Sequence, residues 1–151
     1  MKPVLAVPAL AMILAGCASG PPSPARVDTR NDRCSWCRMA VSDLRYAAQI
    51  VAPGEEPRFF DDPGCLRDYL AGGAEIPRHA TAYVADHRTK DWVAAAKATF
   101  GRVAPSGTPM SSGIAAWADD ASRAADADAA ATTPLSVAEI FGRSGPPGSG
   151  S

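Results

Sequence analysis

RYAAQIVAPGEEPRFFDDPGCLRDYLAGG, residues 45–73, is the stretch that decides the fold class of this chain. Its first part, residues 45–51, combines aromatic and β-branched residues in a short run, which favours a strand. The Pro-Gly-Glu-Glu sequence at 53–56 is typical of a turn, and residues 57–60 favour a second short strand. A pair of strands joined by a tight turn is therefore expected at the start of the fold.

A short helix is expected directly after these strands. Asp62 is a favourable N-cap residue, and Pro63 at the first helical position has no N–H that would need a partner. Gly72 and Gly73 end the helix, because glycine adopts the backbone conformations found after a helix C-terminus. Apolar residues at helical spacing lie on one face of this helix: Leu66, Tyr69 and Leu70.

Further elements are expected along the rest of the chain. Strands are predicted at residues 81–86 and 113–117, and an alanine-rich helix over about 119–130. A last short helix begins after Ser136 as its N-cap and carries Val137, Ile140 and Phe141. Residues 90–102 are ambiguous, since their alanines suit a helix whereas their aromatic and β-branched residues suit strands.

Two parts of the chain resemble each other. The sequence FFDD at residues 59–62 precedes one expected helix, and WADD at residues 117–120 precedes another. Two similar strand-strand-helix halves would account for this likeness. We therefore predict a small single domain of the α+β class, built from two such halves over residues 34–141.

The N-terminus has the pattern of a bacterial lipoprotein signal. A positive residue precedes the apolar run 3–14, which is too short to span a bilayer, because spanning takes about 20 helical residues. The run leads into LAGC at residues 14–17, with small residues directly before a cysteine. We predict that residues 1–16 are a signal peptide and that Cys17 is acylated, with an ordinary secretory signal as the alternative. Ala18 in place of an aspartate favours the outer membrane over the inner one.

Composition sets further limits. Removal of residues 1–16 would leave 135 of the 151 residues, enough for one domain, with a formal net charge of −2 because Lys2 leaves with the signal. No strongly basic surface is then available for phosphate backbones, so no nucleic-acid partner is expected. Residues 17–33 are interpreted as a flexible membrane tether and residues 142–151 as a disordered tail. The domain between them is expected in the periplasm, anchored to the lipid bilayer through Cys17.

The sequence CSWCRM at residues 34–39 carries the chemistry. Cys34 and Cys37 are spaced so that a turn brings both sulfurs to one metal ion or to each other. With Cys17 acylated, three cysteines remain, which is a poor disulfide framework in an oxidising compartment. Structural zinc usually takes four Cys or His ligands, whereas only one cysteine pair is present here. A dithiol oxidoreductase places its pair at a helix N-terminus after a strand, whereas a polar segment precedes Cys34 here. Covalent haem attachment needs His in place of Arg38, and a structural disulfide is a further alternative.

Two methionines favour copper over these alternatives. Met39 follows the cysteine pair, and Met110 lies in a Gly/Pro/Ser-rich loop at 107–113 rather than on an apolar helical face. Thiolate and thioether are soft donors, and soft donors select Cu(I). An isolated methionine is more often a core residue, so the argument needs both. The candidate ligands for Cu(I) are Cys34, Cys37, Met39 and Met110, with Cys65 as a candidate additional ligand.

The order of several short motifs resembles the NosL family. Cys-x-x-Cys-x-Met is followed by FDD-x-GC at residues 60–65, YV-x-D at residues 83–86, Trp92, and Pro-Met at residues 109–110. Members of this family are periplasmic copper lipoproteins that serve the maturation of nitrous oxide reductase. The resemblance implies an α+β fold of two similar halves, and delivery of Cu(I) towards the reductase through a membrane assembly complex. By position, the resemblance implies that Cys37, Met39 and Met110 are the ligands, and it leaves open whether Cys34 is a fourth.

Two positions depart from the family pattern. Arg38 and Ser111 stand where the family usually has glycine, a residue that often serves a positive φ or a close backbone approach. The turn after Cys37 is therefore expected to differ slightly. The Arg38 cation is also expected to lower the pKa of the Cys37 thiol.

The remaining polar candidates have simpler explanations. Cys65 near a helix start is either a buried structural cysteine or a fourth ligand. His79 and His87 are expected at the surface or in hydrogen bonds. Capping explains Asp62 more simply than a metal-binding or acid-base pair with Asp61.

No catalytic function is expected. The sequence contains no supported Ser-His-Asp or Cys-His arrangement, and we predict a copper metallochaperone rather than an enzyme. The main alternative is a periplasmic thiol-disulfide protein that uses Cys34 and Cys37. A structural or interaction lipoprotein with one disulfide is the third hypothesis.

Overall fold

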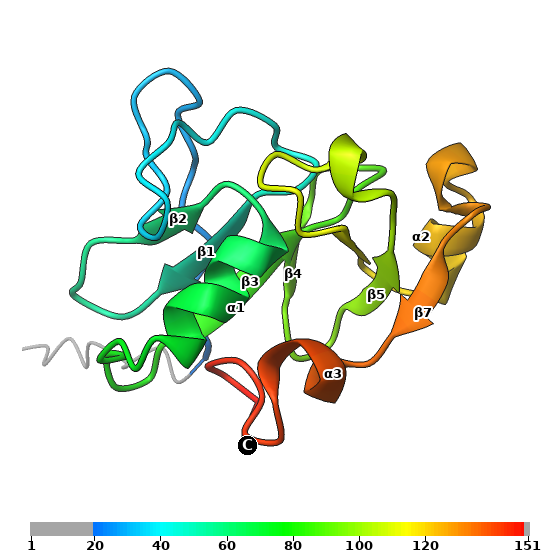
Figure 1. Ribbon diagram of the computed structural model, residues 1–151. Helices are drawn as coiled ribbons and strands as arrows, with labels where there is room; N and C mark the ends of the chain where they lie inside the picture. The colour runs from blue at the N-terminus through cyan, green and yellow to red at the C-terminus, as the bar shows by residue number, and fades with distance from the viewer. Residues whose placement is uncertain (1–19, 150–151) are drawn as a thin grey trace, which may run out of the picture.

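Two small antiparallel sheets form the framework of the fold (Figure 1). The computed structural model describes residues 20–149, and within them the sheets have the strand orders β2-β1-β3-β4 and β6-β5-β7. Short helices connect the strands, and the predicted α+β class of a small single domain is confirmed. The elements are β1 (Ala48–Val51), β2 (Arg58–Phe60), α1 (Pro63–Ala71), β3 (Thr81–Ala85), β4 (Trp92–Ala94), β5 (Thr99–Arg102), η1 (Pro105–Gly107), β6 (Ile114–Trp117), α2 (Asp120–Ala124), η2 (Ala127–Ala129), β7 (Thr133–Leu135) and α3 (Val137–Phe141).

The two sheets repeat one arrangement. The first strand of each half lies in the middle of its sheet, β1 between β2 and β3, and β5 between β6 and β7. A helix follows the second strand in both halves, α1 after β2 and α2 after β6. The similarity of the halves is therefore real, but the equivalent residues are shifted by one from the sequence match, because the two helices are capped by Asp62 and Asp119.

The segment before Cys34 packs on the first sheet. The side-chain amide of Gln49 in β1 accepts a hydrogen bond from the Ala25 N–H at 2.7 Å and donates one to the Ala25 carbonyl at 3.1 Å. Val27 packs in a small apolar cluster with Phe59. The prediction of a flexible tether up to residue 33 is therefore wrong for residues 25–27, which belong to the folded domain.

The C-terminal segment is also held against the first sheet. The N–H of Ala82 in β3 donates to the carbonyl of Pro147 at 2.9 Å. Gly148 lies so close to Thr81 that a Cβ at this glycine would come within 3.1 Å of the threonine side chain. The prediction of a disordered tail over residues 142–151 is therefore wrong for this part of it.

Helix α2 is shorter than the predicted helix over about 119–130. It ends at Ala124, and a 3₁₀ turn follows at Ala127–Ala129. Asp126 lies between them, where its carboxylate accepts hydrogen bonds from His87 Nδ1 at 2.7 Å and Trp117 Nε1 at 2.8 Å. These tertiary contacts outweigh the helix propensity of the surrounding alanines.

Three further strands lie where the sequence was ambiguous or gave no signal. The ambiguous residues 90–102 form strands β4 and β5, and the sequence analysis did not identify β7, an edge strand that can accommodate Pro134. Among residues 20–149, no helix combines the length and apolar character needed to cross a membrane. The predicted signal peptide and the acylation of Cys17 lie outside the described residues.

Buried polar residues after β3 join the two halves. The Asp86 carboxylate accepts hydrogen bonds from the N–H groups of Ala118 at 2.7 Å, Thr89 at 2.8 Å and Arg88 at 2.9 Å. The His87 N–H donates to the carbonyl of Ala116 in β6 at 2.8 Å. Burial opposes ionisation of Asp86, but these hydrogen bonds and one from a serine in α2 outweigh it and lower the pKa of this carboxyl.

Candidate metal centre

The Cys34–Cys37 pair lies on a closed loop beside β2. The Cys34 N–H donates to the Met39 carbonyl at 2.8 Å, and the Arg38 N–H donates back to the Cys34 carbonyl at 3.0 Å. A further bond from Ser35 N–H to the Phe59 carbonyl, at 2.7 Å, ties the loop to β2. Because the backbone closes on itself in this way, the two sulfurs are turned to the same side.

Arg38 completes this loop in a left-handed conformation, with φ of 68°. Residues other than glycine rarely adopt this conformation, because the Cβ then approaches the backbone. A slight difference between this turn and that of relatives with glycine stays a prediction. The arginine keeps the backbone that a glycine would adopt, at a cost of about 1 kcal/mol.

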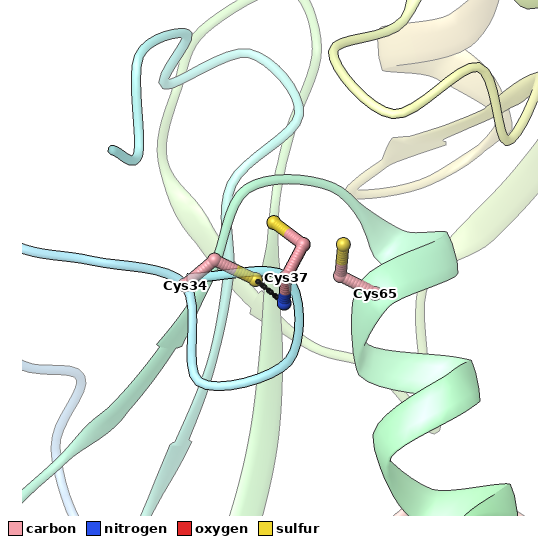
Figure 2. A group of neighbouring side chains, drawn as sticks. All are labelled: Cys34, Cys37 and Cys65. Carbon is pink, nitrogen blue, oxygen red and sulfur yellow. Dashed lines mark hydrogen bonds between the residues drawn. The ribbon is translucent and has the colours of Figure 1, made fainter. Parts of the chain in front are cut away.

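Cys65 lies on the first turn of α1, opposite the loop (Figure 2). The Asp62 side chain caps this helix and accepts a hydrogen bond from the Cys65 N–H at 2.9 Å, as the sequence predicted for the cap. The sulfur atoms of Cys34, Cys37 and Cys65 all lie within 4.8 Å of one another. Three ligands at about 2.3 Å from one metal ion are separated by roughly 4 Å, so these residues could hold a metal ion.

The three thiols do not ionise alike. A hydrogen bond from the Cys65 thiol, helped by backbone N–H groups that include that of Cys37, lowers the pKa of Cys34 to about 5 although burial opposes the shift. Burial is the largest influence on Cys37 and raises its pKa. The bond to Cys34, followed by burial, raises the pKa of Cys65 well above its usual range. The prediction that Arg38 lowers the Cys37 pKa is therefore wrong, and the thiolate forms at Cys34 instead.

The loop that carries Met110 is attached to the same helix start. Asp62, fully buried, accepts a second hydrogen bond from the Met110 N–H at 3.1 Å. The loop also packs on Gly64, where a Cβ would come within 2.3 Å of the Ser112 Cβ. Ser111, between these contacts, has φ of 55° and is again in a glycine-like conformation. Asp62 and Gly64 therefore fix the Met110 loop against the turn that carries Cys65.

The sequence and the site can be compared with known protein families. The sequence profile of the NosL family matches residues 25–138, which is most of the chain. The chain belongs to the NosL family. No curated protein and no solved structure matches it.

The two methionines of this NosL-family chain differ from its cysteines in exposure. Met39 is 56 % exposed and Met110 is 36 % exposed, whereas Cys34 and Cys65 are buried and Cys37 is half-buried. The structure thus places the cysteines in a fixed cluster and the thioethers on the two loops that border it. Ligation by Met39 and Met110 stays a prediction.

Asp61 is the other buried acid beside this cluster. It accepts a hydrogen bond from the Ser42 N–H at 3.1 Å. Burial raises the pKa of this carboxyl, and negative charge at Cys34 acts in the same direction. Its anchored position indicates a structural role in holding the residues after the cysteine loop.

The histidines lie away from the cysteine cluster or have partners. His79 is exposed, and both ring nitrogens of the buried His87 make hydrogen bonds, Nδ1 with Asp126 at 2.7 Å and Nε2 with the Tyr46 hydroxyl at 3.2 Å. Asp126 and Asp128 also come within metal-binding distance of His87. Because Trp117 donates to the same Asp126 oxygen, this second cluster is better explained as a hydrogen-bond network.

Sequence reasoning missed two features of the site. One is the choice between the two roles predicted for Cys65, a structural cysteine or an additional ligand; this residue lies 28 positions after Cys37 and joins the cluster through the path of β1 and β2. The other is the contact of Ser112 on Gly64. The glycine directly after Pro63, at a position where a helix prefers other residues, was the available signal for a close approach.

Proposed function

We propose that this NosL-family protein is a periplasmic Cu(I)-binding metallochaperone that delivers copper for the maturation of nitrous oxide reductase. The observation that carries the proposal is the three-sulfur cluster of Cys34, Cys37 and Cys65, whose sulfurs lie within 4.8 Å of one another. Membership of the family supports copper as the metal. Copper is the cargo of the protein in this account, and no catalytic turnover is proposed.

The donor chemistry fits the cuprous ion. Sulfur ligands are soft and select Cu(I) over harder divalent ions, and the site includes no histidine or free carboxylate. Cys34, already a thiolate near neutral pH, would bind without first losing a proton. Zinc would take four ligands, and thioethers are poor zinc ligands. The three thiols with the neighbouring thioethers therefore favour Cu(I).

The roles of the ligands follow their exposure. Cys34 and Cys65 are buried and would hold the ion from within. Cys37 is half-buried, and Met39 and Met110 are exposed on bordering loops, where they would receive and release the ion. Our proposed ligand set is Cys34, Cys37, Met39 and Met110, with Cys65 added by its position in the cluster.

Location and partners belong to the same proposal. The lipobox ending at Cys17 supports a lipid anchor, in the outer membrane rather than the inner one, with the domain in the periplasm. Family membership supports a copper-accepting reductase and its membrane assembly complex as partners. No nucleic-acid partner is proposed, because the formal net charge is −1.

A thiol-disulfide function of Cys34 and Cys37 is the alternative. The lowered pKa of Cys34 favours it, since a thiolate is the attacking group in disulfide exchange. The placement of the pair opposes it: the loop follows an irregular segment, and the helix start carries Cys65 instead. Exchange with glutathione no faster than that of an unstructured peptide would dismiss this alternative.

An anaerobic competition titration with a Cu(I) chelator tests the proposal. We expect the reduced mature protein to bind one Cu(I) far more tightly than Zn(II). Cys37→Ala and Met110→Ala should each weaken Cu(I) binding and leave the fold intact. The control His79→Ala, at an exposed residue outside the cluster, should leave Cu(I) binding unchanged. Unchanged Cu(I) competition in both ligand variants would contradict the proposed site.

A further inference from the structure

The large apolar side chains that the described residues leave exposed belong to the Cys34–Cys37 loop, the residue pair after it and the loop attached to Asp62. They are Trp36 at 47 %, Met39 at 56 % and Met110 at 36 % exposure. Exposed apolar groups on the loops of a functional site are available for contact with another molecule. The methionines have a proposed role as ligands, but Trp36, between the two cysteines, has none.

Trp36 is held in place on the surface. Its six-membered ring lies over the end of α1, where a Cβ on Gly72 would come within 3.2 Å of Cζ3 and 3.4 Å of Cη2. The glycine leaves room for the ring, and about half of the tryptophan surface stays exposed. A fixed, half-exposed tryptophan loses little conformational entropy on contact and is the residue type most enriched among binding hot spots.

Positive charge surrounds this tryptophan in the sequence. Residues 26–40 contain four arginines and two aspartates, on a chain whose formal net charge is −1. The arginines are exposed, and among residues 20–149 none of the four is in a salt bridge: Arg26, Arg30, Arg33 and Arg38. Arg38 directly follows Cys37. A partner that binds to the segment carrying Trp36 would therefore meet exposed positive charge on the same segment, and its own face should be acidic.

We propose that Trp36 and the arginines beside it form the docking surface for the protein that accepts the copper. The inference rests on the proposed function. A Cu(I) ion held by thiolates leaves by ligand exchange rather than into water, so donor atoms of the acceptor must come close to Cys37 and Met39. Trp36 would anchor the acceptor by apolar contact, and Arg33 and Arg38 would steer its acidic face.

The test measures the rate of Cu(I) transfer from the mature protein, loaded with one Cu(I), to copper-free nitrous oxide reductase in the presence of its membrane assembly complex. We expect Trp36→Ala to slow transfer by about tenfold or more and Trp36→Phe to restore most of the rate. Cu(I) affinity should stay within about twofold, and transfer to a small chelator should not change. Arg33→Gln with Arg38→Gln should reduce the dependence of the rate on salt, whereas Arg143→Gln, an exposed arginine far along the chain, should not.

Each outcome decides between the two proposals. If Trp36→Ala transfers Cu(I) at the wild-type rate, the proposed docking surface is wrong, and the proposed chaperone function is unaffected. Absence of wild-type transfer would count against both delivery and docking, while Cu(I) competition would still report on binding. An effect of Trp36→Ala only on self-association, or only on binding to vesicles of phosphatidylcholine with phosphatidylglycerol, would also overturn a surface for the acceptor.

Discussion

The starts of α1 and α2 are equivalent positions in the two halves, and they carry different chemistry. Each helix has an aspartate N-cap that accepts a hydrogen bond from the third helical residue, Asp62 from Cys65 at 2.9 Å and Asp119 from Ser122 at 2.7 Å. Cys65 joins a cluster of three sulfurs. Ser122 accepts a hydrogen bond from the Arg88 side chain at 3.2 Å and helps to join the halves.

This difference shows that the repeated fold determines where the third helical residue lies but not what that residue does. A capped helix start after a strand presents its third residue at the same place in both halves. The first half brings the Cys34–Cys37 loop to the start of α1, where three sulfurs gather, and the loop that joins β5 and β6 of the second half attaches there through Met110. The second half turns the same position into a buried polar junction. The predictions below test this comparison.

The largest expected effect concerns the two caps. Asp62→Ala would leave the N–H groups of Cys65 and Met110 without their acceptor in a buried site, and should destabilise the protein by about 3 kcal/mol. Asp119 is exposed, and Asp119→Ala should cost only about 1 kcal/mol. Denaturant unfolding of the metal-free protein measures both, with Asp62→Asn as the control that keeps an acceptor. Equal losses at the two caps would show that Asp62 does no more than cap a helix.

Exchange of the third helical residues tests the chemistry of the two positions. Cys65→Ser gives α1 the residue of α2, and it should weaken Cu(I) binding by about 100-fold, because one of three thiolates is lost. Ser122→Cys makes the reverse change and should leave the affinity and the stoichiometry unaltered, since no other sulfur is part of its hydrogen-bond network. Chelator competition measures both. Tight Cu(I) binding that survives Cys65→Ser would remove Cys65 from the ligand set.

Backbone strain on the loops that border α1 has a smaller expected effect. Arg38 and Ser111, on the loops that border α1, have φ of 68° and 55°. Arg38→Gly and Ser111→Gly should each stabilise the protein by about 1 kcal/mol, because glycine adopts this conformation without strain. Ala121→Gly in α2 is the control and should destabilise it by about 1 kcal/mol. Thermal unfolding measures these shifts, and a loss of stability in Arg38→Gly would contradict the assigned strain.

A further prediction concerns the pH dependence of the metal-free protein. The Cys34 pKa is lowered to about 5 in the folded state, whereas an unfolded cysteine titrates near 8.5. The folded state therefore binds fewer protons between these values, so this contribution to stability is complete above about 8.5 and is lost as the pH falls through about 5. Cys37 and Cys65 have raised pKa values and act oppositely at higher pH.

Ultraviolet absorbance of the thiolate during an acid titration measures this effect. One thiolate should appear near pH 5 in the wild-type protein and be absent from Cys34→Ser. Ser122→Cys, which places a thiol at the equivalent position of the other half, should add no thiolate at that pH. Titration of every thiol near its ordinary pKa would show that the cluster does not stabilise a thiolate at Cys34.

Local signals in the sequence were sufficient for much of the first half. Asp62, Pro63 and the Gly72-Gly73 pair defined α1 correctly, because capping and glycine termination act within a few residues. The Cys-x-x-Cys spacing likewise predicted that two sulfurs meet. Capping also predicted α3, where Ser136 and Glu139 form a capping box.

The failures have a common physical cause in contacts between distant segments. Helix α2 ends early because Asp126 bonds to His87 and Trp117. The segment around Ala25 is ordered by Gln49, which is 24 positions away. Such partners have no local signature, so a segment rich in proline and polar residues was interpreted as flexible.

X-ray absorption at the copper edge of the protein loaded with one Cu(I) tests the central claim most directly. The account predicts a shell of sulfur atoms alone around copper, which loses one sulfur in Cys37→Ser and one in Cys65→Ser and is unchanged in Ser122→Cys. A shell that contains nitrogen or oxygen in the wild-type protein, or one that keeps all its sulfurs in both cysteine variants, would contradict it.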